Sequence, residues 1–359
     1  MLTKELLFRL KIQKPDVTYY EQCKKAWDGL SKPLDGFGDF EDLICTLAAI
    51  EGTYFPRVEN RAAVIFCADN GIVEEGVSQC GQDVTFAVAK ALGSGISTAN
   101  TLGKSAKVDV IPVDVGIAEN DDIYGIKYAK INNGTRNFLK EPAMVSAEVC
   151  LAIETGMNLV KELKGRGYDI LATGEMGIGN TTTSAAVLSA ILHIDSDEIT
   201  GRGAGLDDEG LLRKKAVIRE GISKYDFDSI SDEKERAFNI LMCLGGLDIA
   251  ALCGLIIGCG IYHVPVVLDG IISSTAAVVA EKLVQGAANF CIASHRGREV
   301  GNMLALKALG LKPYIDGDMA LGEGTGAIML FPLIDLANDY FVKGAKFSDY
   351  SIDEYKRFS

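Results

Sequence analysis

Histidine is scarce in this sequence, and cysteine pairs of the kind that bind zinc are missing. Only His193, His263 and His295 occur in 359 residues, and the nine cysteines include no CxxC or CxxxC pair. An odd number of scattered cysteines favours a reducing compartment over a disulfide framework. The sequence therefore predicts a cytoplasmic protein without a metal site.

Positive charge is also in short supply. The formal net charge is −13 and the isoelectric point is about 4.8. A nucleic-acid-binding protein needs a basic surface to displace the counterions of the phosphates, and an anionic membrane attracts basic segments. We therefore expect neither partner. A small phosphorylated substrate remains compatible with the charge, because one lysine and one helix N-terminus can bind it locally.

A long uninterrupted apolar run is lacking as well. The most apolar stretch, residues 249–267, is interrupted by Gly254, Gly258, Gly260 and His263 and passes into the strand-like sequence VPVVLDG. We interpret it as a buried helix followed by a strand, not as a membrane span. The first residues, MLTKELLFRLKIQKP, mix charged and apolar side chains, so no secretory leader is expected.

Glycine is abundant, with 39 residues against eight prolines, which suits many tight turns between strands and helices. Apolar β-rich runs end in glycine or acidic residues and precede helical stretches, such as 182–193 and 211–224. These runs are residues 62–71, 108–117, 168–177 and 264–273. The alternation predicts an α/β fold with a doubly wound, Rossmann-like parallel sheet, in which ligands bind at the carboxyl ends of the strands.

The two ends of the chain differ from its centre. The first residues contain the amphipathic run FEDLICTLAAIEG, and the end of the chain is helical and then polar. We predict a small helical domain built from both termini, residues 1–55 plus 332–359. Residues 56–331 then form the large α/β catalytic domain.

A glycine-rich turn, GEMGIGNTTTSAA, follows the third predicted strand. Exposed N–H groups at the start of the next helix, capped by Asn180, Thr181 or Thr182, make an anion site. The sequence is neither a P-loop nor a GxGxxG fingerprint, so ordinary turn chemistry is the alternative interpretation. Glu175 favours a functional site, because a carboxylate beside an anion site is costly unless it has a role.

Two further segments contain candidate residues. GRGAGLDDEGLLRKKAVI leads into a helix whose Lys214 either reaches a phosphate or belongs to a solvated helix face. In LGEGTGA, Glu323 lies between glycines and before an apolar run, so it is either a base with a raised pKa or a solvated turn glutamate. Asp248 and Asp269 stand at element ends, where a single aspartate is usually a helix cap.

The segments DNGIVEEGV, VDVGI, GEMGIGNTT, GGLD, LDG and LGEGTGA occur in this order between residues 69 and 327. Together they resemble the nicotinate-nucleotide–dimethylbenzimidazole phosphoribosyltransferase family, which makes the α-ribotide of cobamide lower ligands. The resemblance extends from about residue 36 to 337. It implies a Rossmann-like sheet with a helical domain from both ends, and a homodimer. The substrates would be nicotinate mononucleotide and an aromatic acceptor, with no cofactor.

The resemblance also implies roles for single residues. Glu323 matches the catalytic base and Glu175 the acidic residue that assists it. The nucleotide and its phosphate would be bound by Gly177, Ile178, Gly179, Asn180, Thr181, Gly203, Lys214, Asp248 and Gly297. The acceptor would be bound by Cys80, Val88, Met176 and Leu321.

Departures from the family pattern keep other acceptors open. Asn70 replaces a histidine, Gly297 replaces a serine, and Cys80 and Val88 replace a more polar pair. A less polar pocket suits phenol or p-cresol, with a purine as another candidate, in a homodimer or in a heterodimer with a related chain. A non-catalytic nucleotide-binding homologue is a further alternative. A nicotinamide-dependent oxidoreductase is disfavoured because no GxGxxG unit follows a strand.

Overall fold

The computed structural model describes residues 1–357 of the chain. The strands are β1 (Arg61–Ala68), β2 (Asp109–Gly116), β3 (Lys127–Tyr128), β4 (Ile170–Met176), β5 (Val266–Leu268), β6 (Cys291–Ala293), β7 (His295–Gly297) and β8 (Ile315–Met319). The helices are α1 (Lys4–Arg9), α2 (Val17–Asp28), α3 (Asp39–Glu51), α4 (Asp83–Gly93), α5 (Thr98–Ala106), α6 (Ser146–Gly165), α7 (Asn180–Leu192), α8 (Ser196–Ile199), α9 (Asp208–Ser223), α10 (Glu233–Leu244), α11 (Leu247–Tyr262), α12 (Ile271–Leu283), α13 (Val300–Leu309) and α14 (Thr325–Lys343). Short 3-10 turns lie at Gly71–Glu75, Ala287–Phe290 and Phe347–Tyr350.

The main sheet has the strand order β3-β2-β1-β4-β5-β6, and every pair in it is parallel. This is the order of a Rossmann-type doubly wound sheet, so the predicted fold class is confirmed. The predicted strands correspond to β1, β2, β4 and β5. The first and last predictions extend too far, because β1 ends at Ala68 and β5 ends at Leu268, with α12 beginning at Ile271. Strands β7 and β8 form a separate parallel pair.

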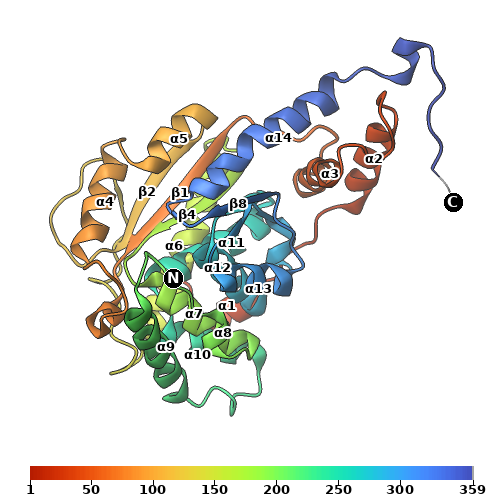
Figure 1. Cartoon of the computed structure of the whole chain (residues 1–359). Coiled ribbons are helices and arrows are strands. Elements are labelled where there is room, and N and C mark those ends of the chain that lie inside the picture. The colour runs from red at the N-terminus through yellow and green to blue at the C-terminus, as the bar shows by residue number, and fades with distance from the viewer. Residues whose placement is uncertain (358–359) are drawn as a thin grey trace.

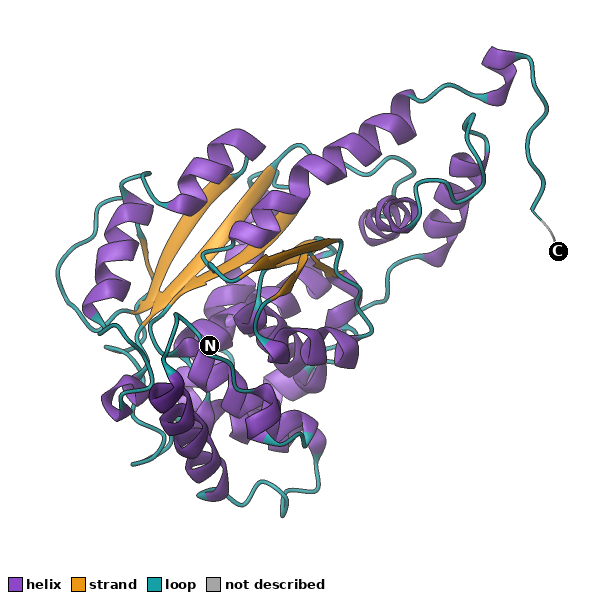
Figure 2. Cartoon of the chain, viewed as in Figure 1, coloured by secondary structure: helices purple, strands orange, loops and turns teal. Residues whose placement is uncertain are grey.

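Helices cover both faces of the sheet (Figure 2). Strand β1 is buried along its whole length, and its side chains alternate between two hydrophobic cores. Val64 and Phe66 face the core that contains α6, α7, α10, α11 and α12. Ile65 and Cys67 face the core under α4, α5 and α14. A strand buried on both faces explains the continuous apolar sequence of β1.

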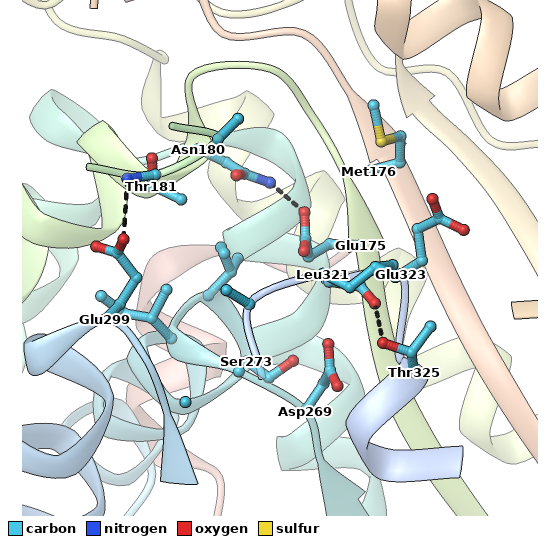
Figure 3. Close-up of a pocket in the computed structure, with 18 of the residues that line it drawn as sticks. Glu175, Met176, Asn180, Thr181, Asp269, Ser273, Glu299, Leu321, Glu323 and Thr325 are labelled. Atoms are coloured by element: carbon cyan, nitrogen blue, oxygen red, sulfur yellow. Dashed lines mark hydrogen bonds between the residues drawn. The ribbon is translucent and has the colours of Figure 1, made fainter. Parts of the chain in front are cut away.

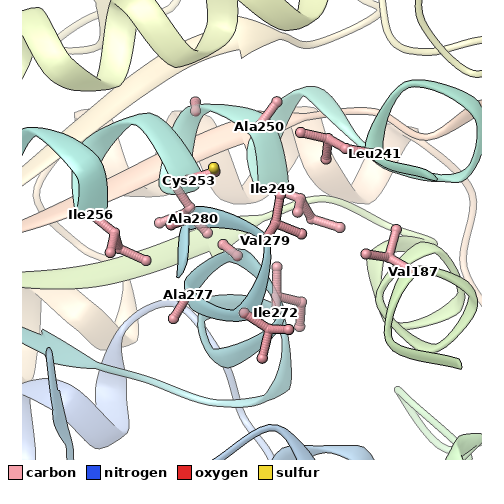
Figure 4. Close-up of a cluster of buried hydrophobic side chains, with 14 of the residues drawn as sticks. Val187, Leu241, Ile249, Ala250, Cys253, Ile256, Ile272, Ala277, Val279 and Ala280 are labelled. Atoms are coloured by element: carbon pink, nitrogen blue, oxygen red, sulfur yellow. The ribbon is translucent and has the colours of Figure 1, made fainter. Parts of the chain in front are cut away.

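Helix α11 is the apolar segment whose glycines argued against a membrane span. It is buried from Leu247 to Gly260 and packs against α6 and α12, as Figure 4 shows for part of this core. A Cβ at Gly254 would lie 2.0 Å from the carbonyl oxygen of Ile153, so the glycines allow α6 and α11 to pack backbone to backbone. The predicted buried helix and following strand are confirmed. In residues 1–357 no helix is long and apolar enough to cross a membrane.

Helices α2 and α3, which follow α1 in the chain, lie near the far end of α14 (Figure 1). Trp27 of α2 packs against Phe341 of α14, with 5.1 Å between the ring centroids. Helix α1 instead packs on α6 in the large core, through Leu7. The boundary expected after residue 331 falls inside α14, and residues 358 and 359 lie outside the described residues. The division into two domains stays a prediction, and the position of α1 argues for a small unit that begins at α2.

Candidate active site

A cavity of about 310 Å³ opens at the carboxyl ends of β4 and β5, beside the point where the strand order reverses between β1 and β4. Ligands bind at this place in doubly wound sheets. Its walls come from the turn between β4 and α7, the start of α12, the β7–β8 pair and the loop before α14 (Figure 3). Segments far apart in the chain therefore meet at one edge of the sheet.

Most of the residues expected at the site line this cavity. They are Val88, Glu175, Met176, Gly177, Ile178, Asn180, Thr181, Gly203, Gly297, Leu321 and Glu323. Four expected residues lie outside its lining: Cys80, Gly179, Lys214 and Asp248. Lys214 and Asp248 are fully buried behind it, and each bonds to a residue that lines it. Cys80 sits in the loop before α4, and the structure assigns it no contact with the cavity.

Two buried carboxylates share one amide. The Nδ2 group of Asn180 donates to the Glu175 carboxylate and, at 3.0 Å, to Oδ2 of Asp248. Burial, together with the negative charge of Asp248, raises the pKa of Glu175 to about 8. Burial also raises the pKa of Asp248 to about 6. In the free enzyme Glu175 therefore holds its proton at neutral pH.

Helix α7 begins differently from the expectation. Gly179 is its N-cap, with φ of +93°, and no side chain caps it in the described part of the chain. The predicted caps are wrong because Asn180 turns to the carboxylates and Thr181 accepts a hydrogen bond of 2.8 Å from Lys214 Nζ. The N–H groups of Asn180, Thr182 and Thr183 donate to the carbonyl oxygens of Gly177 and Gly179, and no side chain among residues 1–357 caps the helix start. The positive end of the helix dipole at this uncapped start favours an anion.

Lys214 lies behind this helix start. It is 0% exposed, so the alternative of a solvated helix face is wrong for this residue. Burial lowers its pKa to about 8, and the nearby Glu299 partly offsets this effect. A negative ligand at the start of α7 would therefore stabilise the protonated lysine.

The loop at residues 201–205 closes the other side of the anion site. The backbone N–H of Gly203 donates to Glu299 Oε1 at 2.9 Å. Gly203 has φ of +56°, and a Cβ there would lie 2.7 Å from Thr181 Oγ1 and 3.2 Å from Lys214 Nζ. Only glycine fits this contact without displacing the threonine. Glu299 was missed by the sequence reasoning, since no local pattern marks it.

Glu323 lies in a strained turn. Gly322, Glu323 and Gly324 have φ values of +86°, +57° and +75°, a left-handed conformation that is unfavourable for glutamate. Its Oε2 atom is buried without a hydrogen-bond partner among residues 1–357. Burial raises the pKa of this carboxyl above its usual value. The interpretation as a solvated turn glutamate is therefore wrong. In Figure 3 its carboxylate points away from that of Glu175.

The acceptor half of the cavity is apolar. Val84 and Val88, one turn apart on α4, line it together with Met176 and Leu321. Val84 was not predicted, although its spacing of four residues from Val88 places both on one helix face. This wall offers apolar contacts to a flat ring.

Several other lining residues were also missed. Among them are Ser273, His295, Arg298, Glu299 and Thr325, and also Asp269, which was expected only as a helix cap. The expectation that Asp269 is a helix cap is correct in kind, but it caps α14 and not the α12 helix that follows it. Sequence proximity cannot reveal a partner that lies 57 residues away. No group of three or more His, Cys, Asp or Glu side chains within residues 1–357 forms a metal site.

The doubly wound sheet, the uncapped helix start beside a buried lysine and the buried carboxylates are the features of an α/β enzyme with a site for a small nucleotide. A family profile described as "Phosphoribosyltransferase" matches residues 12–352. The nicotinate-nucleotide–dimethylbenzimidazole phosphoribosyltransferase of Ruminiclostridium cellulolyticum is 40% identical over 96% of this chain and 97% of its own. The protein of the same name from Acetivibrio thermocellus is 39% identical over 94% of each chain.

A solved structure agrees with these sequence relatives. The crystal structure of CobT from Thermus thermophilus has a TM-score of 0.88 and 32% identity, and the match covers 94% of this chain and 100% of that one. The chain belongs to the nicotinate-nucleotide–dimethylbenzimidazole phosphoribosyltransferase family. It is a pentosyltransferase by this membership.

Proposed function

We propose that this enzyme transfers the phosphoribosyl group of nicotinate mononucleotide to 5,6-dimethylbenzimidazole or a related aromatic base. The products are an α-ribotide and nicotinate, and the α-ribotide serves the nucleotide loop of a cobamide. One observation carries the proposal: a single cavity joins an anion-binding helix start, two carboxyl groups with raised pKa and an apolar wall. The names of the relatives support the same reaction.

The phosphate of the nucleotide binds at the start of α7. The uncapped helix start and Gly203 surround it, and Thr181 stands between it and Lys214. Lys214 acts through Thr181 and through its charge, which the phosphate stabilises. Gly177, Ile178 and Gly297 supply close backbone approach on the remaining sides.

Glu175 responds to the charge of the nucleotide. Nicotinate mononucleotide contains a positively charged pyridinium ring, which lowers the pKa of a nearby carboxyl. Glu175 then ionises, and its carboxylate stabilises the positive charge that develops on the ribose as the bond from C1′ to the pyridinium nitrogen breaks. The electron pair of that bond neutralises the departing nicotinate ring. Asn180 holds Glu175 in place and Asp248 holds Asn180.

Glu323 is the general base. A ring nitrogen of the acceptor attacks C1′ from the face opposite the departing nicotinate, which converts the β-nucleotide into the α-ribotide. The other ring nitrogen of the azole loses its proton to Glu323. A phenol would lose its O–H proton to the same carboxylate. Burial raises the pKa of Glu323, which makes its carboxylate a stronger base than an ordinary glutamate.

The proposal is tested by incubating the purified protein with nicotinate mononucleotide and an equimolar mixture of dimethylbenzimidazole, adenine, phenol and p-cresol. Products are identified by mass. We expect the α-ribotide of dimethylbenzimidazole. Dominant phenolic product would instead support the second candidate, which the apolar wall of Val84, Val88, Met176 and Leu321 favours. Nucleotide binding without any product would support a non-catalytic homologue.

We further propose that the enzyme works in the cytoplasm as a homodimer. The family resemblance supports the dimer, and so do exposed apolar side chains on α14, namely Met329, Leu336 and Val342. Analytical ultracentrifugation of the purified chain tests this assembly. A monomer that becomes active only with a related chain would support the heterodimer.

A further inference from the structure

We propose that Asp269 is a positioning residue, which holds Glu323 in its left-handed backbone conformation and so aims the base at the acceptor. The inference rests on the proposed function, in which Glu323 accepts the acceptor's proton. Asp269 stands directly after β5, while Glu323 stands shortly before α14. The two residues are thus joined by tertiary structure and not by local sequence.

The turn around Glu323 needs an external restraint. Three successive residues, Gly322, Glu323 and Gly324, have positive φ. Glycine adopts this region freely, but a glutamate leaves it unless neighbouring groups hold it there. The side chain of Glu323 provides little of this restraint: its Oε2 atom has no partner in the described chain, where the backbone N–H of Ala99 is the only hydrogen-bonding group that acts on the pKa of its carboxyl.

Asp269 provides hydrogen bonds on the C-terminal side of the turn. Its Oδ2 atom accepts from the N–H of Gly324 at 3.2 Å, directly after Glu323. Its Oδ1 atom accepts from Gly326 at 2.8 Å and from Ala327 at 3.2 Å. Asp269 is only 3% exposed, so water competes little for these bonds. The carboxylate also lies at the N-terminus of α14, where the helix dipole favours a negative charge.

The position of Asp269 is itself set by the sheet. Its backbone N–H donates to Thr173 Oγ1 at 3.0 Å, and the Thr173 hydroxyl donates to Val267 O at 3.2 Å. Thr173 is fully buried in β4, two residues before Glu175. A continuous set of bonds therefore links β4, β5 and the turn that contains Glu323.

The first turn of α14 packs closely against Asp269 and a neighbouring histidine. A Cβ at Gly326 would lie 2.1 Å from His295 Nδ1 and 3.0 Å from Asp269 Oδ1. His295 Nδ1 is in turn 2.8 Å from the hydroxyl of Ser294. Glycine at position 326 therefore lets the N-terminus of α14 approach the Asp269 carboxylate closely.

The test compares Asp269→Asn, Glu323→Gln and the double variant. Glu323→Gln lowers kcat by roughly 10²–10⁴-fold, the usual contribution of a general base. Asparagine has the shape of aspartate but accepts weaker hydrogen bonds from the backbone N–H groups. We therefore expect Asp269→Asn to lower kcat by about tenfold or more, but by no more than Glu323→Gln does. The KM for nicotinate mononucleotide stays within about twofold, because the phosphate site is untouched. In the Glu323→Gln background, Asp269→Asn causes no further fall.

Asp114→Asn is the matched control. Asp114 is also a buried carboxylate at the end of a strand, is 1% exposed, and accepts two backbone hydrogen bonds, from Gly116 at 3.0 Å and Ile117 at 2.9 Å. It lies outside the cavity lining. We expect this variant to lose thermal stability without a selective loss of kcat. If Asp269→Asn does not fold, Thr173→Val removes the anchor of Asp269 and is expected to reduce kcat in the same Glu323-dependent way.

Three results would overturn the inference: an unchanged kcat in Asp269→Asn, equal losses with and without the Glu323 carboxylate, or a crystal structure of Asp269→Asn in which Glu323 keeps its positive φ. The crystal structure can be determined whether or not the variant is active. An inactive wild-type enzyme that binds nicotinate mononucleotide would instead refute the proposed function, and the two failures are thereby distinguished.

Discussion

The carboxyl groups of Glu175, Asp248, Asp269 and Glu323 are all held where water does not reach them freely. Burial is the first cause of the raised pKa at each of these residues. Such groups respond strongly to a charge that enters the cavity, because the low dielectric lets it act over several ångströms. This sensitivity leads to a prediction about the binding step.

Binding of nicotinate mononucleotide at pH 7 is expected to release protons from Glu175. The free residue is protonated at this pH, because its pKa is about 8, and the pyridinium charge lowers that pKa. Titration calorimetry in two buffers of different ionisation enthalpy measures the release. The Glu175→Gln variant should release less. Equal heats in both buffers for the wild type would contradict the prediction.

The sequence predicts single residues correctly where they line the cavity directly. Glu175, Asn180 and Glu323 line the cavity together, as their glycine-rich surroundings indicated. Cys80 does not line it, because Cys80 lies in the loop before α4, whereas Val84 and Val88 of the helix itself form this wall. The partner of Asp269 was not predictable, since it depends on how α14 returns to the end of β5.

At the scale of elements, the loop 201–205 and the start of α7 form one anion site. Gly203→Ala is expected to raise the KM for nicotinate mononucleotide by roughly tenfold, with a smaller effect on the KM for the acceptor. An alanine there costs about 1–2 kcal/mol of backbone strain, and its Cβ meets Thr181 Oγ1 at 2.7 Å. Steady-state kinetics with each substrate varied in turn measure both values.

Gly205→Ala is the control for this variant. Gly205 has φ of +101°, but a Cβ there would meet only Gln79 Oε1, at 3.9 Å. Gly205→Ala therefore adds backbone strain without a new contact at the anion site. We expect it to lower stability but to leave the KM for the nucleotide unchanged. Equal KM values for the nucleotide in both variants would argue against a role of Gly203 in phosphate binding.

The contact between α6 and α11 makes a prediction about stability. Gly254→Ala would place a Cβ 2.0 Å from Ile153 O, so the two helices must separate. Such overpacking typically costs about 1–3 kcal/mol. At Gly165, in the last turn of α6, a Cβ would meet nothing within 4 Å. Gly165→Ala is therefore expected to stabilise the helix by about 0.5–1 kcal/mol. Urea denaturation of both variants measures the free energy of unfolding, which should fall for Gly254→Ala and rise for Gly165→Ala.

At the scale of the whole molecule, the buried carboxyls influence how stability depends on pH. A carboxyl whose folded pKa exceeds its unfolded value binds more protons in the folded state, so the free energy of unfolding falls as pH rises between the two values. For Glu175 this window runs from its ordinary value of 4.5 to about 8. Carboxyl groups with a lowered pKa, such as Glu74 and Glu148, influence the free energy of unfolding at pH values below this window.

Glu175→Gln is therefore expected to gain stability relative to the wild type as pH rises. The gap in unfolding free energy should widen by about 1.4 kcal/mol per pH unit inside the window. Urea midpoints at pH 5, 6, 7 and 8 measure this gap. A constant gap would mean that Glu175 is ionised in the free enzyme.

The fold class follows from the sequence alone, because strands buried on both faces must be continuously apolar and must alternate with helices. The family follows from it as well, and so do eleven of the 25 residues that line the cavity, since glycines and carboxylates at strand ends meet at one edge of a parallel sheet. Which groups support the reacting ones depends instead on how the chain packs. Lys214 reaches Thr181, Glu299 reaches Gly203 and Asp269 reaches the turn of Glu323 across 33 to 96 residues of chain. Such pairs arise only when elements pack, and no local pattern encodes them.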